Sequence, residues 1–139
     1  MKSYILITGA TGGLGQALAV ECAARGWDLF LTDLDAGSLV CLSHGLERLH
    51  NVHVLTYACD LTDAEEREAL WQHAAQRALR FHMLFNVAGV DYQGPFEERR
   101  VEELRTIVRL NVESTVETTR RVLVYRDPVR TLRIVNVCS

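Results

Sequence analysis

The stretch TGATGGLG occupies residues 8–15, and four of its eight residues are glycine. It follows a short apolar run of strand-forming residues and leads into a segment with helical spacing. A glycine-rich turn between a buried strand and a helix is where a dinucleotide-binding fold places a pyrophosphate. Gly9 would allow the tight turn, a bare Gly12 or Gly13 would admit a phosphate, and Gly15 would let the helix approach the sheet.

The same alternation of strand and helix patterns continues along the chain. Apolar runs rich in β-formers alternate with longer segments whose apolar residues recur at helical spacing. This pattern predicts an α/β protein with a doubly wound parallel sheet, the Rossmann fold, in a single domain over residues 1–139. The expected strands are residues 3–8, 28–32, 52–56, 81–87 and 131–138, and the expected helices are residues 13–25, 36–49, 62–79 and 101–125.

Two of the expected helices carry signals of their own. Thr62 and Glu65 form a Thr-x-x-Glu pattern that predicts a capping box, and Asp63 and Glu66 add negative charge at the same helix start. The last helix has a stripe of mostly apolar residues, made of Val101, Leu104, Val108, Val112, Thr115, Val116, Thr119 and Leu123.

Composition and charge narrow the class of protein. The net charge is −3, so the chain has no excess of positive charge that would attract nucleic acid or an anionic membrane. Apolar runs fall far short of the roughly 20 residues that span a bilayer, and the N-terminus has no leader pattern, so we expect a cytoplasmic protein. Four scattered cysteines without a C-x-x-C pair indicate reduced thiols, and no histidine has the spacing of a metal ligand.

Asp33 is the residue that bears on the choice of cofactor, because it ends the second strand pattern, 20 residues after Gly13. A carboxylate there can accept hydrogen bonds from the ribose hydroxyls of NAD, whereas the 2′-phosphate of NADP would meet like charge. At about 4 Å and an effective dielectric near 20, that repulsion is roughly 4 kcal/mol before screening. Leu34 offers no compensating charge, so the sequence favours NAD over NADP. A P-loop is excluded because the only lysine is Lys2.

Four further motifs follow the glycine turn in order. CDLTD at residues 59–63, NVAG at 86–89, LNVES at 110–114 and IVNVCS at 134–139 resemble the short-chain dehydrogenase/reductase family along the whole chain. The glycine turn alone fits both TGxxxGxG, of single-domain oxidoreductases, and TGxxGxxG, of longer epimerase-like relatives. NVAG resembles the NNAG of the first branch, with Val87 replacing the second Asn. The resemblance implies an NAD-dependent oxidoreductase acting on a small alcohol or carbonyl substrate.

The resemblance also implies roles for individual residues. Asn111 matches the family's catalytic Asn, which orders a water in a proton relay, and Ser139 matches the catalytic Ser, which hydrogen-bonds the reacting oxygen. Without the resemblance, Asn111 would be interpreted as a polar residue on the packed face of a helix, and Ser139 as a turn residue after a strand. The implied cofactor contacts are Gly9, Thr11, Gly12, Gly13, Leu14, Gly15, Asp33, Asp60, Leu61, Asn86, Ala88 and Gly89.

The acid–base pair of the family is missing from these residues. The resemblance implies a Tyr beyond Ser139 and a Lys one helical turn later, and with Lys2 the only lysine no Tyr-x-x-x-Lys exists in this sequence. General acid–base catalysis contributes about 10²- to 10⁴-fold, so we expect NAD binding without efficient turnover. The alternative is a non-catalytic NAD-binding or regulatory module that ends near Ser139.

A fold that is incomplete relative to the family would expose apolar surface. The fifth strand would be an apolar sheet edge able to pair with another chain, and the last helix would leave part of its stripe bare. We therefore expect these residues either to form a homo-oligomer or to be the ordered part of a longer protein.

Overall fold

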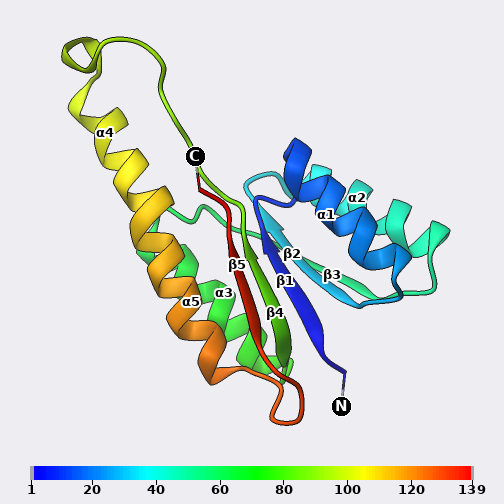
Figure 1. Cartoon of the computed structure of the whole chain (residues 1–139). Coiled ribbons are helices and arrows are strands. Elements are labelled where there is room, and N and C mark those ends of the chain that lie inside the picture. The colour runs from blue at the N-terminus through cyan, green and yellow to red at the C-terminus, as the bar shows by residue number, and fades with distance from the viewer. Residues whose placement is uncertain (1, 139) are drawn as a thin grey trace.

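Five short apolar segments form one parallel sheet in the computed structural model, which describes residues 2–138. The strand order is β3-β2-β1-β4-β5, so the chain builds outward from β1 in both directions (Figure 1). This confirms the doubly wound α/β fold that the sequence predicts. The strands are β1 Tyr4–Thr8, β2 Leu29–Asp33, β3 Val54–Ala58, β4 Phe81–Asn86 and β5 Arg133–Asn136.

Helices cover both faces of the sheet. α1 and α2 lie on one face, and α3 lies on the other beside a long helical run formed by α4, η2 and α5 (Figure 1). Within residues 2–138, no helix is both long enough and apolar enough to cross a membrane. The bounds are α1 Gly13–Ala24, α2 Ala36–Leu49, α3 Ala64–Gln76, η1 Phe96–Glu98, α4 Val101–Ile107, η2 Val108–Ser114 and α5 Thr115–Val124.

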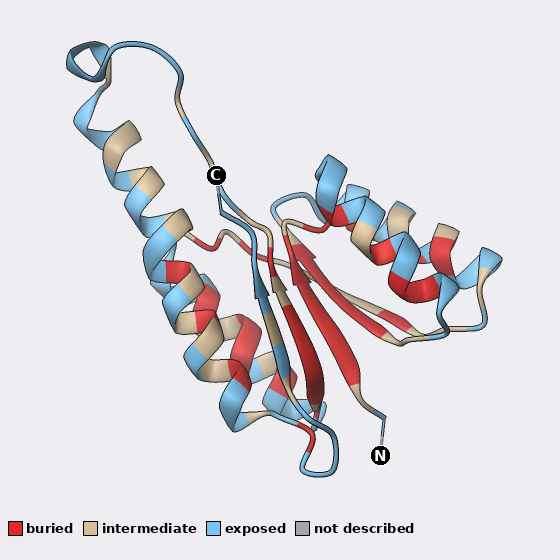
Figure 2. Ribbon diagram, viewed as in Figure 1, coloured by how far each residue is buried: buried red, intermediate tan, exposed pale blue. Residues whose placement is uncertain are grey.

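The sheet separates two apolar cores, and alternate residues of β1 contribute to each. Leu6 packs with Phe30 and Trp71 in the core beneath α3 and α5, whereas Ile5 and Ile7 point into the core beneath α1 and α2. Because helices cover both faces, β1 is buried along its whole length. Burial is concentrated in the central strands, while β5 at the sheet edge is largely exposed (Figure 2).

The start of α3 differs from the sequence prediction. Its N-cap is Asp63, whose carboxylate accepts hydrogen bonds from the backbone N–H groups of Glu65 at 2.9 Å and Glu66 at 3.4 Å. The Thr62 hydroxyl instead donates to Asp60 at 2.7 Å. The predicted Thr62–Glu65 capping box is therefore wrong, because an Asp one residue later satisfies the free N–H groups of the first turn.

The predicted long helix at residues 101–125 is present as a continuous run, but its middle part, η2, is π-helical. The buried side of the run carries Ser114 and Val122. Part of the apolar stripe faces away from the core, with Val112 55% and Val116 65% exposed, whereas Leu104 and Thr119 are half-buried. Part of the stripe and the β5 edge are therefore bare, as the sequence leads us to expect.

Candidate cofactor site

The glycine turn between β1 and α1 has no room for a side chain at two positions. Gly9 has a φ of +64°, and a Cβ there would lie 2.9 Å from the backbone of Ala88. A Cβ on Gly15 would lie 2.0 Å from the carbonyl oxygen of Gly9 and 2.8 Å from the Cα of Ala10. Gly9 thus makes the tight turn and Gly15 the close helix approach that the sequence pattern predicts.

The first turn of α1, directly after the glycine turn, has backbone N–H groups that no side chain caps. Gly12 is the N-cap, and no side chain caps the helix or places an acidic group in its first turn. The N–H groups of Gly13, Leu14 and Gly15 have no acceptor within the helix, because they belong to its first turn. These N–H groups and the positive end of the helix dipole favour an anionic group.

A cavity of about 680 Å³ lies in front of this helix end. It lies beyond the carboxyl ends of β1, β2, β3 and β4, and so includes the point between β1 and β4 where the strand order reverses, which is the usual ligand position in open α/β sheets. Among its described lining residues the only charged side chains are two aspartates. It is lined by Gly9, Thr11, Gly12, Gly13, Leu14, Gly15, Asp33, Leu34, Cys59, Asp60, Leu61, Thr62, Val87, Ala88, Gly89, Val90, Tyr92, Thr106 and Leu110.

Asp33 is held at the cavity wall by the glycine turn. Its Oδ2 accepts hydrogen bonds from the Thr11 backbone N–H at 2.9 Å and from the Thr11 hydroxyl at 2.7 Å. Its Oδ1 accepts one from the Leu34 N–H at 2.8 Å. The Gln16 side-chain amide donates to the Thr11 carbonyl at 3.1 Å and so ties the turn to α1. These contacts fix the orientation of the Asp33 carboxylate.

The wall contributed by the segment after β3 is held by the start of α3. The Asp60 carboxylate accepts hydrogen bonds from the N–H and the hydroxyl of Thr62, at 2.9 and 2.7 Å. The Asp60 N–H donates to Glu66 Oε1 at 3.0 Å. The carbonyl of the buried Leu61 accepts from Arg67 Nη1 at 2.8 Å. Sequence reasoning missed Arg67, because a charged residue in a polar helix start reads as solvent-exposed.

The opposite wall, after β4, depends on a second residue that sequence reasoning missed. The Thr8 hydroxyl oxygen accepts hydrogen bonds from the N–H groups of Val87 and Ala88 at 3.1 Å each. These contacts place the segment after β4 against the glycine turn. The sequence does contain a signal for this role of Thr8, because Thr8 is the first residue of the glycine motif and ends the first apolar strand pattern.

Asn86, a predicted cofactor contact, lies off the cavity. Its side chain is buried, and Nδ2 donates to Asn136 Oδ1 at 2.8 Å and to Thr119 Oγ1 at 3.0 Å. These bonds join β4, β5 and α5, so in this structure the side chain of Asn86 links secondary-structure elements. All the other predicted cofactor contacts line the cavity.

Asn111 exchanges two hydrogen bonds with the backbone of Val90. Its Oδ1 accepts from the Val90 N–H and its Nδ2 donates to the Val90 carbonyl, both at 2.8 Å. One N–H and one lone pair of the amide remain free to hold a water. Asn111 does not line the cavity, although its neighbour Leu110 does. Ser139 lies outside the described residues.

The π-helical segment η2 carries Asn111. π-Helical turns are rare, and they are frequently found at functional sites. Within η2 the Ser114 hydroxyl donates to the Leu110 carbonyl at 2.6 Å. That bond takes up a backbone acceptor four residues back, a contact that often bends helices.

A parallel sheet whose strand order reverses at a glycine turn, with an aspartate at the end of β2, defines a dinucleotide-binding α/β protein. Residues 3–139 match the family described as short chain dehydrogenase, and the chain belongs to this family. The predicted family resemblance is therefore confirmed.

Individual relatives agree with the family match. The chain is 31% identical over 137 residues to levodione reductase of Leifsonia aquatica, covering 97% of this chain and 51% of the relative. It is 30% identical over 116 residues to an (S)-acetoin-forming diacetyl reductase of Staphylococcus epidermidis, with 84% and 45% covered. A short-chain dehydrogenase from Sphingobium yanoikuyae, solved in complex with NADPH, superposes with a TM-score of 0.89 at 30% identity, covering 99% and 54%. The chain spans about half the length of the relatives it matches.

Proposed function

We propose that the cavity binds NAD and that the chain is the cofactor-binding part of an oxidoreductase that interconverts an alcohol and a carbonyl compound. The observation that carries this proposal is the fixed Asp33 carboxylate beside the bare glycine turn. The free N–H groups at the start of α1 suit a pyrophosphate, and Asp33 suits ribose hydroxyls. When bound, the nicotinamide ring would donate or accept the hydride.

The charge of the cavity wall supports NAD over NADP. Asp33 and Asp60 are the charged groups among the described lining residues, so a 2′-phosphate would meet repulsion without a cation to offset it. The solved Sphingobium relative holds NADPH. The proposed preference of this chain for NAD therefore rests on its own aspartates, Asp33 and Asp60.

Calorimetric titration of the 139-residue chain with NADH and with NADPH, at one ionic strength, tests the proposal. We expect a single saturable site with a lower Kd for NADH. Tighter binding of NADPH would overturn the role given to Asp33, and absence of binding by either nucleotide would overturn the cofactor site itself.

For the chemical step we propose that Asn111 holds a relay water and that Ser139 hydrogen-bonds the reacting oxygen of the substrate. The two free hydrogen-bonding positions of the Asn111 amide support the first role. The role of Ser139 rests on the motif IVNVCS alone. Because these residues contain no Tyr-x-x-x-Lys, we propose that the chain by itself turns over slowly or not at all.

An assay of NADH oxidation with a panel of small ketones tests this part. We expect the 139-residue chain to show no more than background turnover. Ordinary turnover by this chain would contradict the proposal. The coding sequence after Ser139 distinguishes this enzyme from the alternative, a non-catalytic binding module. A Tyr-x-x-x-Lys there supports the enzyme, and a stop codon supports the module.

We also propose that this chain forms a homo-oligomer through its bare apolar surface. The exposed residues Val108, Val112 and Val116 lie on one stripe of the long helical run, and the β5 edge has free backbone groups. Sedimentation velocity tests this, and we expect Val112→Glu to shift the distribution toward monomer. A wild-type chain that remains monomeric at high concentration would contradict the proposal.

A further inference from the structure

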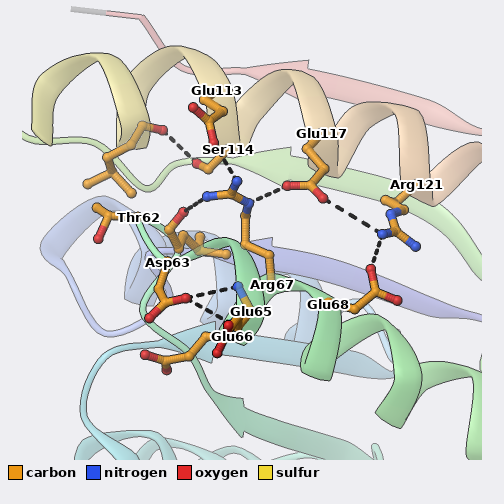
Figure 3. Close-up of polar contacts among 12 residues, drawn as sticks. Thr62, Asp63, Glu65, Glu66, Arg67, Glu68, Glu113, Ser114, Glu117 and Arg121 are labelled. Atoms are coloured by element: carbon orange, nitrogen blue, oxygen red, sulfur yellow. Dashed lines mark hydrogen bonds and ion pairs between the residues drawn. The ribbon is translucent and has the colours of Figure 1, made fainter. Parts of the chain in front are cut away.

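Arg67 is a buried cation between the cavity wall and the long helical run (Figure 3). The residue is 3% exposed, although it lies in the first turns of α3. Its Nη1 donates to the Leu61 carbonyl at 2.8 Å, its Nη2 donates to Glu113 at 2.5 Å, and its Nε donates to Glu117. One guanidinium therefore binds three acceptors on three different segments.

Two of the three acceptors, Leu61 and Glu113, belong to segments that line the cavity, whereas Glu117 lies on α5, which contributes none of the described lining residues. Leu61 lines the cavity and is one of the cofactor contacts that the family resemblance implies. Glu113 lies in η2, two residues after Asn111, and η2 also contributes the lining residue Leu110. The planar, forked guanidinium suits such a junction, whereas a lysine ammonium would be a single compact charge.

We propose that Arg67 is a positioning residue for the cofactor site, because it holds the Leu61 wall and the Asn111-bearing η2 segment in one fixed relation. This inference rests on the proposed cofactor function. Arg67 does not line the cavity, so any effect on cofactor binding acts through Leu61 and η2.

Arg121 provides a matched comparison on the same pair of elements. It bonds Glu68 on α3 and lies 3.8 Å from Glu117 on α5, so it too joins α3 to the long helical run (Figure 3). Unlike Arg67, its side chain is one-third exposed, and its recorded partners are not cavity residues. Loss of Arg121 weakens helix docking alone, whereas loss of Arg67 also releases the cavity wall.

Removal of the Arg67 head group should leave a protein that folds. The side chains of Glu113 and Glu117 are 54% and 29% exposed, so both carboxylates can be solvated after the cation is gone. The Leu61 carbonyl is different, because its residue is buried and loses its donor. We therefore expect the Leu61 segment to move toward another donor and to change the shape of the cavity.

The experiment compares Arg67→Met with Arg121→Met. Dissociation constants for NADH and for ADP-ribose are measured at a temperature where circular dichroism shows every protein to be folded. We expect Arg67→Met to weaken both ligands by about tenfold or more and Arg121→Met by about twofold or less. Equal effects of the two substitutions on binding, whatever their effects on the melting temperature, would overturn the inference.

Glu113→Gln keeps the inference testable if Arg67→Met does not fold. It replaces a half-exposed carboxylate by an isosteric neutral acceptor, so it weakens one of the three Arg67 bonds. We expect Glu113→Gln alone to lower the affinity for NADH by about threefold, and an unchanged Kd would contradict the role of Arg67. Where Arg67→Met does fold, we expect little further loss when the two substitutions are combined, and full additivity in the double variant would contradict that role as well.

The wild-type titration separates failure of this inference from failure of the proposed function. If the wild-type chain binds neither ligand, the cofactor site is wrong and the inference falls with it. If the wild-type chain binds NADH and Arg67→Met binds it equally well, the cofactor site stands and only the positioning role is wrong.

Discussion

The side-chain amide of Asn111 pairs with the backbone of Val90 as a neighbouring strand would, through two hydrogen bonds of 2.8 Å. The pairing ties the π-helical segment to the loop that follows β4. Gly89 lies next to this pairing, and a Cβ there would lie 3.3 Å from the Asn111 Oδ1. The residue that the family resemblance makes catalytic therefore also shapes the rim of the cavity.

Asn111→Ala should loosen this rim. Two hydrogen bonds are lost and the partly buried backbone of Val90 loses its partners, so we expect the free energy of unfolding to fall by about 1–3 kcal/mol. Urea denaturation measures the change, and Asn51→Ala at an exposed position is the control, with an expected effect within about 0.5 kcal/mol. Equal stabilities of the two variants would show that the Asn111–Val90 pairing contributes nothing to the free energy of unfolding.

Gly15 and Gly13 should respond in opposite ways to alanine. A Cβ on Gly15 would collide with the Gly9 carbonyl at 2.0 Å, so Gly15→Ala should lower stability by about 3 kcal/mol or more. A Cβ on Gly13 meets nothing within 4 Å, and Gly13→Ala should leave stability unchanged or raise it by up to about 1 kcal/mol. Thermal unfolding of both variants checks this, and a stable Gly15→Ala protein would be inconsistent with the close approach of α1.

Asp33→Asn should shift the cofactor preference. Removal of the carboxylate charge takes away the repulsion toward a 2′-phosphate, so the affinity for NADPH relative to NADH should rise about tenfold or more. The matched control is Asp35→Asn, because Asp35 caps α2 and does not line the cavity. Titrations of both variants with NADH and with NADPH measure the shift. A similar shift in both variants would show that Asp33 does not set the cofactor preference.

Stability should fall in mild acid because of His82. Burial lowers the pKa of His82, Arg130 and Arg133 lower it further, and Asp127 partly opposes them. The unfolded chain takes up this proton near pH 6.5 and the folded chain only at lower pH, so unfolding becomes more favourable as pH drops below about 6.5. His73, whose pKa is lowered by burial and by Arg77, acts in the same direction.

The measurement is the urea midpoint at about pH 7.5 and pH 5.5 for the wild type and for His82→Asn. We expect a lower midpoint in acid for the wild type and a smaller drop for the variant. His44→Asn, at an exposed position of α2, is the control and should keep the full drop. An acid drop that is the same in all three proteins would contradict the assignment to His82.

The sequence predicts the sheet and the glycine turn well because both depend on local patterns. Apolar runs mark the strands, and the tight contacts at Gly9 and Gly15 follow from a motif whose spacing is visible in the chain. Local patterns fail where two local partners compete. Asp63 replaces Thr62 as the cap of α3 because both residue types can accept the same N–H groups.

The contacts that sequence reasoning missed are between segments far apart in the chain. Asn86 bonds Asn136 across 50 residues, and Arg67 bonds Glu113 and Glu117 across 46 and 50 residues. Periodicity reports which side of an element is apolar, but it does not report which distant polar group will meet a buried one. The π-helical register of η2 likewise has no signal in the sequence pattern.

Binding of NAD in the cavity is tested most directly by an amide chemical-shift map of the 15N-labelled chain during titration with NAD. We expect the largest shifts at Gly12, Gly13 and Leu14 in the glycine turn and at Asp33, with little change at Arg133 on β5. Saturable shifts confined to residues outside the cavity, or no shifts at all, would contradict binding in the cavity.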